Sequence, residues 1–330
     1  MDSRYLPMLF FVNLMLVTAH AALSPQLYWK MMLPNTPMPK SIKEFVKHGE
    51  YLGHMQKETI DDQNARIMMW GKSTGKQLQD KALLHDDTKE SESQSDAAIA
   101  HHPKKRPEMN HQIDDVKVDL IFFEDGLSPG TKMDAHFNKT EYRKPLLPRQ
   151  VAQRIPFSSE KINEILQILS VKPNSEMANA AETQIRICEG PPRIGDEKFC
   201  ATSLESMLDY VISRLGNNLR AFATYAEKEG KPQKFLVKNG VKTLAEGNVI
   251  ACHLMDYPYA VFFCHHLEKT TTHFMPLEGE DGTRVQAVVV CHRDTSFWDP
   301  DNMELQALKV RPGDCPVCHI FPEVHVVFTK

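Results

Sequence analysis

The sequence predicts an α+β fold in which amphipathic helices are followed by a mostly antiparallel, β-rich C-terminal domain stapled by disulfides. Three observations predict it. Apolar residues recur with helical spacing in the middle of the chain. The last third has strand-like alternation and dipeptides typical of hairpin turns. Five of the seven cysteines follow residue 250, and none precedes Cys188.

Composition narrows the function classes. The chain has 330 residues, a formal net charge of −4 and 42% hydrophobic residues, which suits about two domains of ordinary size. A general nucleic-acid binder would carry a basic excess, so the mildly acidic total argues against a nucleic-acid partner. Seven cysteines are too few, in a chain this long, for a small scaffold held together only by disulfides.

Residues 1–22 are predicted to be a secretory signal peptide. Residues 5–17 form a short apolar run, and Ala19 and Ala21 supply a small-x-small cleavage pattern. The run is shorter than the ~20 residues of a membrane span; an uncleaved anchor or a buried helix is the alternative. We expect a mature protein with no membrane association, in a compartment where paired cysteines form disulfides. On that route Asn138, in an Asn-Lys-Thr triplet, becomes a glycosylation acceptor.

Two segments precede the predicted folded domain. Residues 23–51 are interrupted by prolines, and Ser41 is placed to cap a short helix through Phe45. Residues 52–115 are polar and mixed in charge, and they contain no Phe, Tyr or Trp after Trp70. They cannot bury enough apolar surface to offset chain entropy. We therefore predict a disordered polar spacer; a weak metal or processing site within it is the alternative.

The folded domain is predicted to occupy residues 116–330. Its first element is expected to be a strand at residues 118–123. An amphipathic helix follows over residues 162–169, where apolar side chains recur at the i, i+3, i+4, i+7 spacing. Ser158 or Ser159 is predicted to cap that helix.

A second amphipathic helix is predicted over residues 204–215. Its apolar residues have the same spacing. Thr202 and Glu205 match a capping box at its start, and Gly216 is predicted to end it.

The rest of the domain is predicted to be sheet. Asn239-Gly240 and Asp281-Gly282 are typical of two-residue hairpin turns, so each is expected to join two antiparallel strands. The segments with the clearest strand character are residues 248–253, 260–265, 285–292 and 325–328.

Four Cys-His dipeptides carry the strongest functional signal: Cys252-His253, Cys264-His265, Cys291-His292 and Cys318-His319. Successive dipeptides are separated by 10, 25 and 25 residues. Chance does not readily place four copies of a rare dipeptide so close together. A common structural role for the four is therefore expected.

Strand geometry suggests what that role is. Neighbouring side chains of a strand point to opposite faces, so Cys291 and His292 are not expected to bind the same ion. The oxidised cysteines would pair behind the sheet, in one of three possible pairings, and the imidazoles would converge on the other side. Imidazole suits copper, zinc or nickel, and Cu²⁺ binds most tightly among divalent first-row ions. We therefore predict a copper site. The alternative is four core or surface histidines that flank structural disulfides.

The remaining histidines receive structural interpretations. His273 and His325 are interpreted as isolated histidines, either solvated or in the core, and the alternative is that they join the metal site. His266 is left out of the cluster because it faces away from His265 in a regular strand.

The remaining cysteines are predicted to form one further disulfide. Cys188 and Cys200 enclose a Gly/Pro-containing loop, and their pairing leaves Cys315 over. Cys315 to His319 also matches C-x-x-C-H, the pattern of c-type haem attachment. We reject haem because His319 already belongs to the fourfold series.

At these residues the chain resembles the plant BURP-domain family, whose signature is CH-x10-CH-x25–27-CH-x25–26-CH. Further matches are FFEDGLSPGTKM, CEGPPRIGDEKFCATSLESMLDYV, YPYAVFFCHH and the ending PVCHIFPEVHVVF. Residues 23–51, called the hallmark segment below, contain the family feature LYWKMMLPNTPMPKSIKEF. Residues 116–330 are identified as the BURP domain. The short spacer is similar to the seed-protein-like or dehydration-responsive-like branches, and Cys315 is a departure from the family pattern.

The resemblance implies a secreted plant protein of seed, cell-wall or stress biology, in the extracellular space, the cell wall or a storage vacuole. In some members the Cys-His histidines bind copper and the cysteines form disulfides. The resemblance therefore implies copper at His253, His265, His292 and His319.

Three functions remain open, and no catalytic residue is assigned. The first is a non-enzymatic, copper-binding role. The second is a copper-dependent peptide cyclase that cross-links a Tyr or Trp of its own N-terminal peptide, for which Tyr28, Trp29 and Trp70 are the candidates. The third is a non-catalytic subunit of a cell-wall enzyme, with wall components as partners.

Overall fold

The computed structural model describes residues 23–47, 120–137, 144–192 and 197–330. The predicted signal peptide and the predicted spacer lie outside the described residues. So do Trp70, Asn138 and the predicted start of the folded domain at residue 116.

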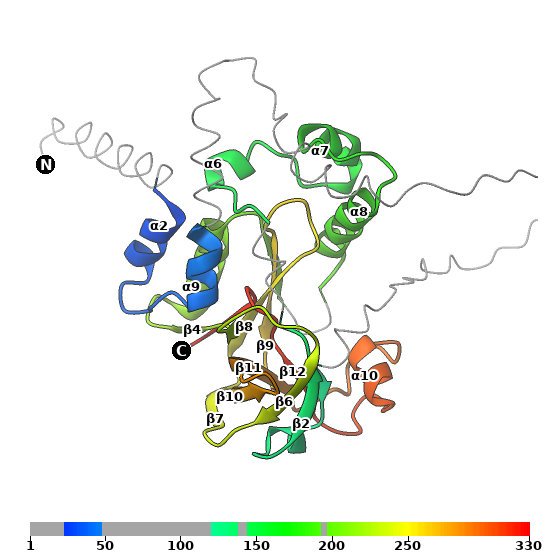
Figure 1. The fold of residues 1–330 in the computed structure, drawn as a ribbon. Coiled ribbons are helices and arrows are strands. Elements are labelled where there is room, and N and C mark those ends of the chain that lie inside the picture. Colours follow the sequence, from blue (N-terminus) through cyan, green and yellow to red (C-terminus); the bar gives the residue numbers. More distant parts are fainter. Residues whose placement is uncertain (1–22, 48–119, 138–143, 193–196) are drawn as a thin grey trace, which may run out of the picture.

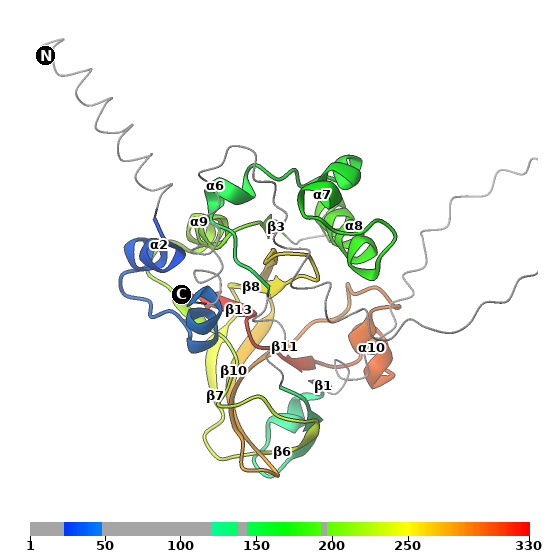
Figure 2. The same cartoon turned by 45° about the horizontal axis from the view of Figure 1, so that its top comes forward.

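The described residues form an α+β structure with two antiparallel sheets and three disulfides, so the predicted fold class is confirmed. Most of the helices gather at one side of the sheets, as Figure 1 shows, while α10 lies apart from them near β1 (Figure 2).

The larger sheet has eight strands. Its main path runs β1-β12-β11-β10-β6-β2, while β5 pairs with β11 and β7 pairs with β10. The bounds are β1 Ile121–Phe122, β2 Lys132–Ala135, β5 Tyr225–Ala226, β6 Gln233–Val237, β7 Lys242–Glu246, β10 Thr270–Gly279, β11 Arg284–His292 and β12 Val317–Ile320. The β10–β11 hairpin turns at Asp281-Gly282, as predicted, and Gly282 has a φ of 77° that favours glycine.

The smaller sheet has five strands in the order β3-β9-β8-β13-β4. Their bounds are β3 Lys198–Ala201, β4 Arg220–Phe222, β8 Val249–Leu254, β9 Phe262–Leu267 and β13 Val326–Thr329. The four segments predicted as strands correspond to β8, β9, β11 and β13, so those predictions are confirmed. The strand predicted over residues 118–123 is shorter in the structure, where β1 covers two residues.

The helices are α2 Pro25–Met32, a helix at residues 40–47, α6 Arg149–Ala152, α7 Ile162–Ile168, α8 Glu176–Glu189, α9 Leu204–Leu215 and α10 Met303–Leu308, with short 3₁₀ helices at Glu124–Leu127 and Ser159–Lys161. Within the residues that the structure describes, none of these helices has the length and apolarity that a bilayer crossing would require.

Helix α2 was not predicted, although its ends have recognisable chemistry. The Ser24 hydroxyl accepts a hydrogen bond from the amide of Leu27, and Pro25 occupies the first turn, where its missing amide costs nothing. Tyr28 and Trp29 lie on its buried face and pack with α9 over the outer face of the smaller sheet. Figures 1 and 2 both show α2 beside α9.

The capping box of α9 is displaced by one residue from the prediction. Ser203, rather than Thr202, is the N-cap: its hydroxyl accepts from the amide of Ser206, while the Ser206 hydroxyl accepts from the amide of Ser203. Glu205 is buried instead, and its carboxylate accepts from the backbone amide of Arg149. The predicted end of α9 at Gly216 is confirmed.

Two other predicted caps are wrong. Ser158 and Ser159 donate their hydroxyls to the carboxylate of Glu189, at the end of α8, in charge-assisted hydrogen bonds that hold both side chains toward α8. Helix α7 therefore begins directly after a 3₁₀ turn with no side-chain cap. Ser41 lies inside the helix at residues 40–47, and its buried hydroxyl has no hydrogen-bond partner among the residues that the structure describes.

The predicted hairpin at Asn239-Gly240 is also wrong. Strands β6 and β7 do not pair with each other; both pair with the same edge of β10, one after the other. The dipeptide interrupts this edge where the amide of Lys238 donates to the carbonyl of Pro276. Pro276 has no amide hydrogen to continue the ladder, so the neighbouring chain leaves the sheet there.

The three disulfides are Cys188–Cys200, Cys252–Cys264 and Cys291–Cys318. Strand pairing selects the last two, because Cys252 lies opposite Cys264 on β8 and β9, and Cys291 lies opposite Cys318 on β11 and β12. Among the described residues, Cys315 is the cysteine without a disulfide partner.

One apolar cluster lies between the two sheets. It consists of alternate strand residues and therefore marks the inner faces of the sheets; its members are Val249, Ala251, Leu267 and Val327 from the smaller sheet, Val288 and Val290 from the larger one, and Phe321 beyond β12. The same alternation carries His253 and His292 into the inner layer. It turns Cys252 and Cys291 to the outer faces, where each lies in a different apolar cluster.

Candidate metal centre

The candidate site is a group of histidine side chains in the layer between the sheets. Strands β8 and β9 of the smaller sheet supply His253 and His265, and strands β11 and β12 of the larger sheet supply His292 and His319. The structure thus places all four predicted histidines on inner faces, two from each sheet.

The four rings form one connected cluster. The ring centre of His253 lies 5.4 Å from that of His265 and 6.5 Å from that of His319, and the ring of His319 lies 5.5 Å from that of His292. Neighbouring rings are stacked, with interplanar angles of 10° to 27°. The buried ring of Phe321 packs against both His253 and His319, which places an apolar side chain beside the centre of the cluster.

A fifth imidazole lies in the cluster. Nδ1 of His325 lies 3.2 Å from Nδ1 of His253, whereas the sequence interpretation favoured an isolated His325 over one that joins the site. The signal that could have found it is strand register. Strand β13 pairs with β8 so that Val326 lies opposite Cys252, and the next position places His325 opposite His253.

Two other histidines lie outside the cluster, as interpreted from the sequence. His273 is buried and contacts the hydroxyls of Thr243 and Thr271. His266 contacts the side-chain oxygen of Asn248.

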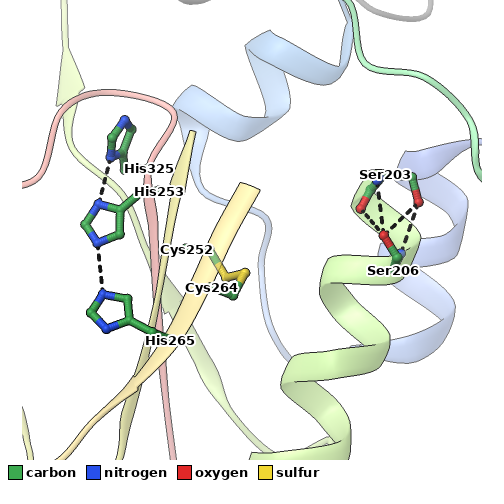
Figure 3. Close-up of a disulfide and its surroundings, with 7 residues drawn as sticks. All are labelled: Ser203, Ser206, Cys252, His253, Cys264, His265 and His325. Atoms are coloured by element: carbon green, nitrogen blue, oxygen red, sulfur yellow. Dashed lines mark hydrogen bonds between the residues drawn. A yellow bond between two sulfur atoms is a disulfide. The ribbon is translucent and has the colours of Figure 1, made fainter. Parts of the chain in front are cut away.

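Three of the rings form a row of nitrogen contacts, which Figure 3 shows on the opposite side of the strands from the Cys252–Cys264 disulfide. Nε2 of His253 lies 3.3 Å from Nε2 of His265, and Nδ1 of His253 faces His325. A neutral imidazole has one donor and one acceptor nitrogen. The row can therefore be hydrogen-bonded without carrying a charge.

The surroundings favour neutral rings. Burial lowers the pKa of His253 well below its ordinary value, and repulsion from the imidazoles of His325, His265, His319 and His292 lowers it further. Burial also lowers the pKa of His319. Because metal ions bind the neutral imidazole, these residues are held in the ligand form near neutral pH.

The donor set fits an ion that prefers nitrogen ligands. The Nε2 atoms of His253 and His265 lie 3.3 Å apart, so these two imidazoles already face each other and would hold an ion together. The motif cysteines supply no thiolates, since all four are in disulfides. In the part of the chain that is described, no three potential ligands are yet placed to hold an ion together. His292 and His319 would therefore have to turn toward the pair.

All five imidazoles of the cluster are half-buried. The ring of His292 lies 4.8 Å from that of Trp298, and the neighbouring Phe297 is 75% exposed. Aromatic side chains thus flank the cluster at His292.

Tyr28 and Trp29 lie on the other side of the smaller sheet. They pack in the outer cluster that contains Cys252 and Cys264. The Tyr28 hydroxyl donates to Asp209, and burial, aided by this carboxylate, raises the pKa of Tyr28 to about 12. In this structure the sheet itself separates both side chains from the imidazoles.

The metal-free protein is expected to lose stability as the pH falls below about 6.5. The pKa of His253 is lowered in the folded state, so the unfolded chain takes up the proton first. The contribution to stability is complete above about pH 6.5 and falls by about 1.4 kcal/mol per pH unit for each such histidine, until the folded-state pKa is passed. The pKa of His319 is also lowered, so this residue makes stability fall with falling pH in the same way.

Urea unfolding at about pH 7.5 and at about pH 5 measures this dependence. The variant His253→Gln should show a shallower pH dependence than the wild type, because glutamine does not titrate. Equal slopes for the two proteins would contradict a buried, neutral His253.

Comparison with known proteins gives a consistent assignment. The BURP domain model matches residues 120–330. BURP domain-containing protein 3 of Oryza sativa subsp. japonica is 47% identical over 223 residues, which cover 66% of this chain and 52% of that protein. BURP domain protein RD22 of Arabidopsis thaliana is 43% identical over 221 residues, which cover 65% of this chain and 56% of that protein. These alignments span about half the length of either relative.

A third relative is similar over nearly its whole length. BURP domain-containing protein 5 of Oryza sativa subsp. japonica is 34% identical over 318 residues, which cover 94% of this chain and 89% of that protein. The similarity therefore includes the N-terminal part of the chain as well as the Cys-His region.

Proposed function

This chain belongs to the plant BURP-domain family, and from that premise we propose that it is a secreted copper-binding protein. The observation that carries the proposal is the inner layer of histidines. Four strands of two different sheets each direct one motif imidazole into the same half-buried cluster, and the adjoining cysteines join these strands in pairs on the outer faces. A purely structural role for the disulfides does not require an imidazole after each cysteine.

Copper is favoured by the kind of ligand in the layer. The donors are imidazole nitrogens, with no free motif thiolate. Imidazole suits copper, zinc and nickel, and Cu²⁺ is the tightest-binding of the divalent first-row ions at a given site. Reorientation of His292 and His319 toward the pair of His253 and His265 would complete the ligand set.

The proposed role is non-enzymatic, in seed, cell-wall or stress biology. Disulfides persist in oxidising compartments and are rare in the cytosol, so the three bonds support a location on the secretory pathway. The final location is proposed to be the extracellular space, the cell wall or a storage vacuole.

Copper binding by the oxidised protein tests the proposal. The wild type is expected to retain copper through dialysis, and His253→Ala to lose it, because His253 contacts both neighbouring imidazoles. Metal analysis and competition with a chelator measure the two affinities. The matched control is His266→Ala, which removes an imidazole beside His265 that lies outside the cluster.

Two outcomes would contradict the copper proposal. One is a wild type that retains no copper although its three disulfides are intact. The other is a folded His253→Ala variant that binds copper as tightly as the wild type does. Circular dichroism of each variant separates loss of the site from loss of the fold.

A second candidate function is a copper-dependent cyclase that cross-links its own N-terminal peptide. The observation that favours it is the position of His292, which is half-buried and lies beside Trp298, close in sequence to the exposed Phe297, where a peptide could approach the imidazoles. Incubation with copper and oxygen, digestion and mass spectrometry would show a two-hydrogen loss in a peptide that contains Trp70 or Trp29. If the protein binds copper but no peptide shows the two-hydrogen loss, the cyclase function is contradicted and the non-enzymatic role is retained.

A further inference from the structure

The histidine cluster contains one imidazole, that of His325, that the Cys-His motifs do not supply. We propose that His325 is a positioning residue: it accepts a hydrogen bond from Nδ1–H of His253 and thereby leaves Nε2 of His253 free to bind the ion. The inference deepens the proposed copper site and rests on it.

The two ring nitrogens of His253 have different neighbours, and each nitrogen can therefore have a different role. Nε2 faces the Nε2 atom of His265, another motif histidine, at 3.3 Å, whereas Nδ1 faces the Nδ1 atom of His325 at 3.2 Å. A metal-bound histidine almost always donates its other ring N–H to a partner, which holds the ring in one tautomer and one orientation. In this site His325 is the group placed to accept that hydrogen.

The choice of tautomer matters for binding. If His253 carried its hydrogen on Nε2, that hydrogen would point at the space between His253 and His265, and Nε2 would have no lone pair for an ion. An acceptor opposite Nδ1 favours the other tautomer. His325 would thus prepare the ligand before an ion arrives.

The backbone holds His325 in place through an unusual conformation. The preceding residue, Val324, has a φ of 72°, which β-branched residues rarely adopt. Its side chain is fully buried in the outer cluster of the smaller sheet. The amide of His325 donates to the carbonyl of Pro322 across the same turn. Strained residues persist where their surroundings impose the conformation, and they cluster at functional sites.

Packing limits the movement of the His325 ring as well. It lies edge-on to the ring of His253, with centres 5.3 Å apart, and edge-on to Phe321 at 6.2 Å. Strand β13, which begins at Val326, is paired with β8 along the residues that follow. The acceptor nitrogen is therefore fixed relative to the strand that carries His253.

The test compares two substitutions of His325. His325→Phe keeps a ring of similar size and removes the acceptor, whereas His325→Asn keeps a polar atom near the position of Nδ1. His266→Phe is the matched control, because it makes the same replacement at a histidine outside the cluster. All three are studied as the full oxidised protein.

Two measurements are made on each variant. In the metal-free protein, ¹⁵N chemical shifts of the imidazoles report the tautomer of His253. We expect the Nδ1–H form in the wild type and in His325→Asn, and a mixture of forms in His325→Phe. Competition with a chelator reports Cu²⁺ affinity, which should fall about 10- to 100-fold in His325→Phe. It should fall less in His325→Asn, and it should not change in His266→Phe.

Four results would overturn the inference. They are an Nε2–H tautomer in the wild type, an unchanged Cu²⁺ affinity in His325→Phe, an equal loss in both His325 variants, and electron paramagnetic resonance spectra in which His325→Phe loses a copper-bound nitrogen. The last would make His325 a ligand. If the wild type binds no Cu²⁺ but the tautomer changes as expected, the copper proposal fails, and the selection of the His253 tautomer by His325 is retained.

Discussion

Replacement of Trp29 by alanine is expected to lower the free energy of unfolding by about 3–5 kcal/mol. The indole is only 2% exposed, and it packs against Phe328 of β13 with ring centres 5.9 Å apart. Its Nε1–H donates to the carbonyl of Thr36 at 2.8 Å, which would lose its partner in the variant. Denaturant unfolding of the oxidised protein measures the change.

The control for this prediction is Leu27→Ala on the same helix. Leu27 is 49% exposed, so its truncation should change stability by only about 0.5 kcal/mol or less. A loss below about 1 kcal/mol for Trp29→Ala would mean that the hallmark segment is not part of the core.

The same result bears on the cyclase alternative. A cross-link at Trp29 would require α2 to leave the outer face of the smaller sheet, on the opposite side from the imidazoles. If Trp29→Ala is strongly destabilising, a cross-linked tryptophan in this chain has to be sought elsewhere, and Trp70 is the candidate outside the described residues. Detection of a two-hydrogen loss at Trp29 would contradict the packing of α2.

Local sequence patterns predicted those parts of the site that depend on strand alternation. The division between cysteines and histidines follows from one strand at a time, because successive side chains of a strand point to opposite faces. That is why His253 and Cys252 could be assigned to different layers before any pairing was known. Likewise, Asp281-Gly282 could be assigned to a hairpin because the turn and its flanking strands are adjacent in sequence.

Features that depend on contacts between distant segments were not predicted. His325 joins the cluster through the pairing of β13 with β8, which are separated by more than 70 residues. Strand β10 was expected only as the partner before the Asp281-Gly282 turn, without bounds, and it contains Pro276, which normally argues against a central strand. Helix α2 is short, and its stability comes from packing on α9 and the sheet rather than from its own eight residues.

Removal of the Cys291–Cys318 disulfide by a double substitution to alanine is expected to lower the free energy of unfolding by about 3–4 kcal/mol. The bond closes a segment with a sequence separation of 27, so its loss returns conformational entropy to the unfolded chain. It should be made in a Cys315→Ser background, so that no free thiol remains to exchange with the two other disulfides or to join two molecules. Cys315→Ser alone is the control, with little expected change, and denaturant unfolding measures all three proteins.

The disulfide also has a predicted consequence for the inner layer. It joins β11 and β12 directly behind His292 and His319, whose rings stack at 5.5 Å. If the bond restrains these strands, the double variant should bind Cu²⁺ more weakly than the Cys315→Ser control under conditions in which both proteins remain folded. A loss of stability with unchanged affinity would show that the larger sheet aligns these imidazoles without the disulfide. A loss of both would mean that each cysteine restrains the histidine that follows it, which explains why the two residues occur together four times.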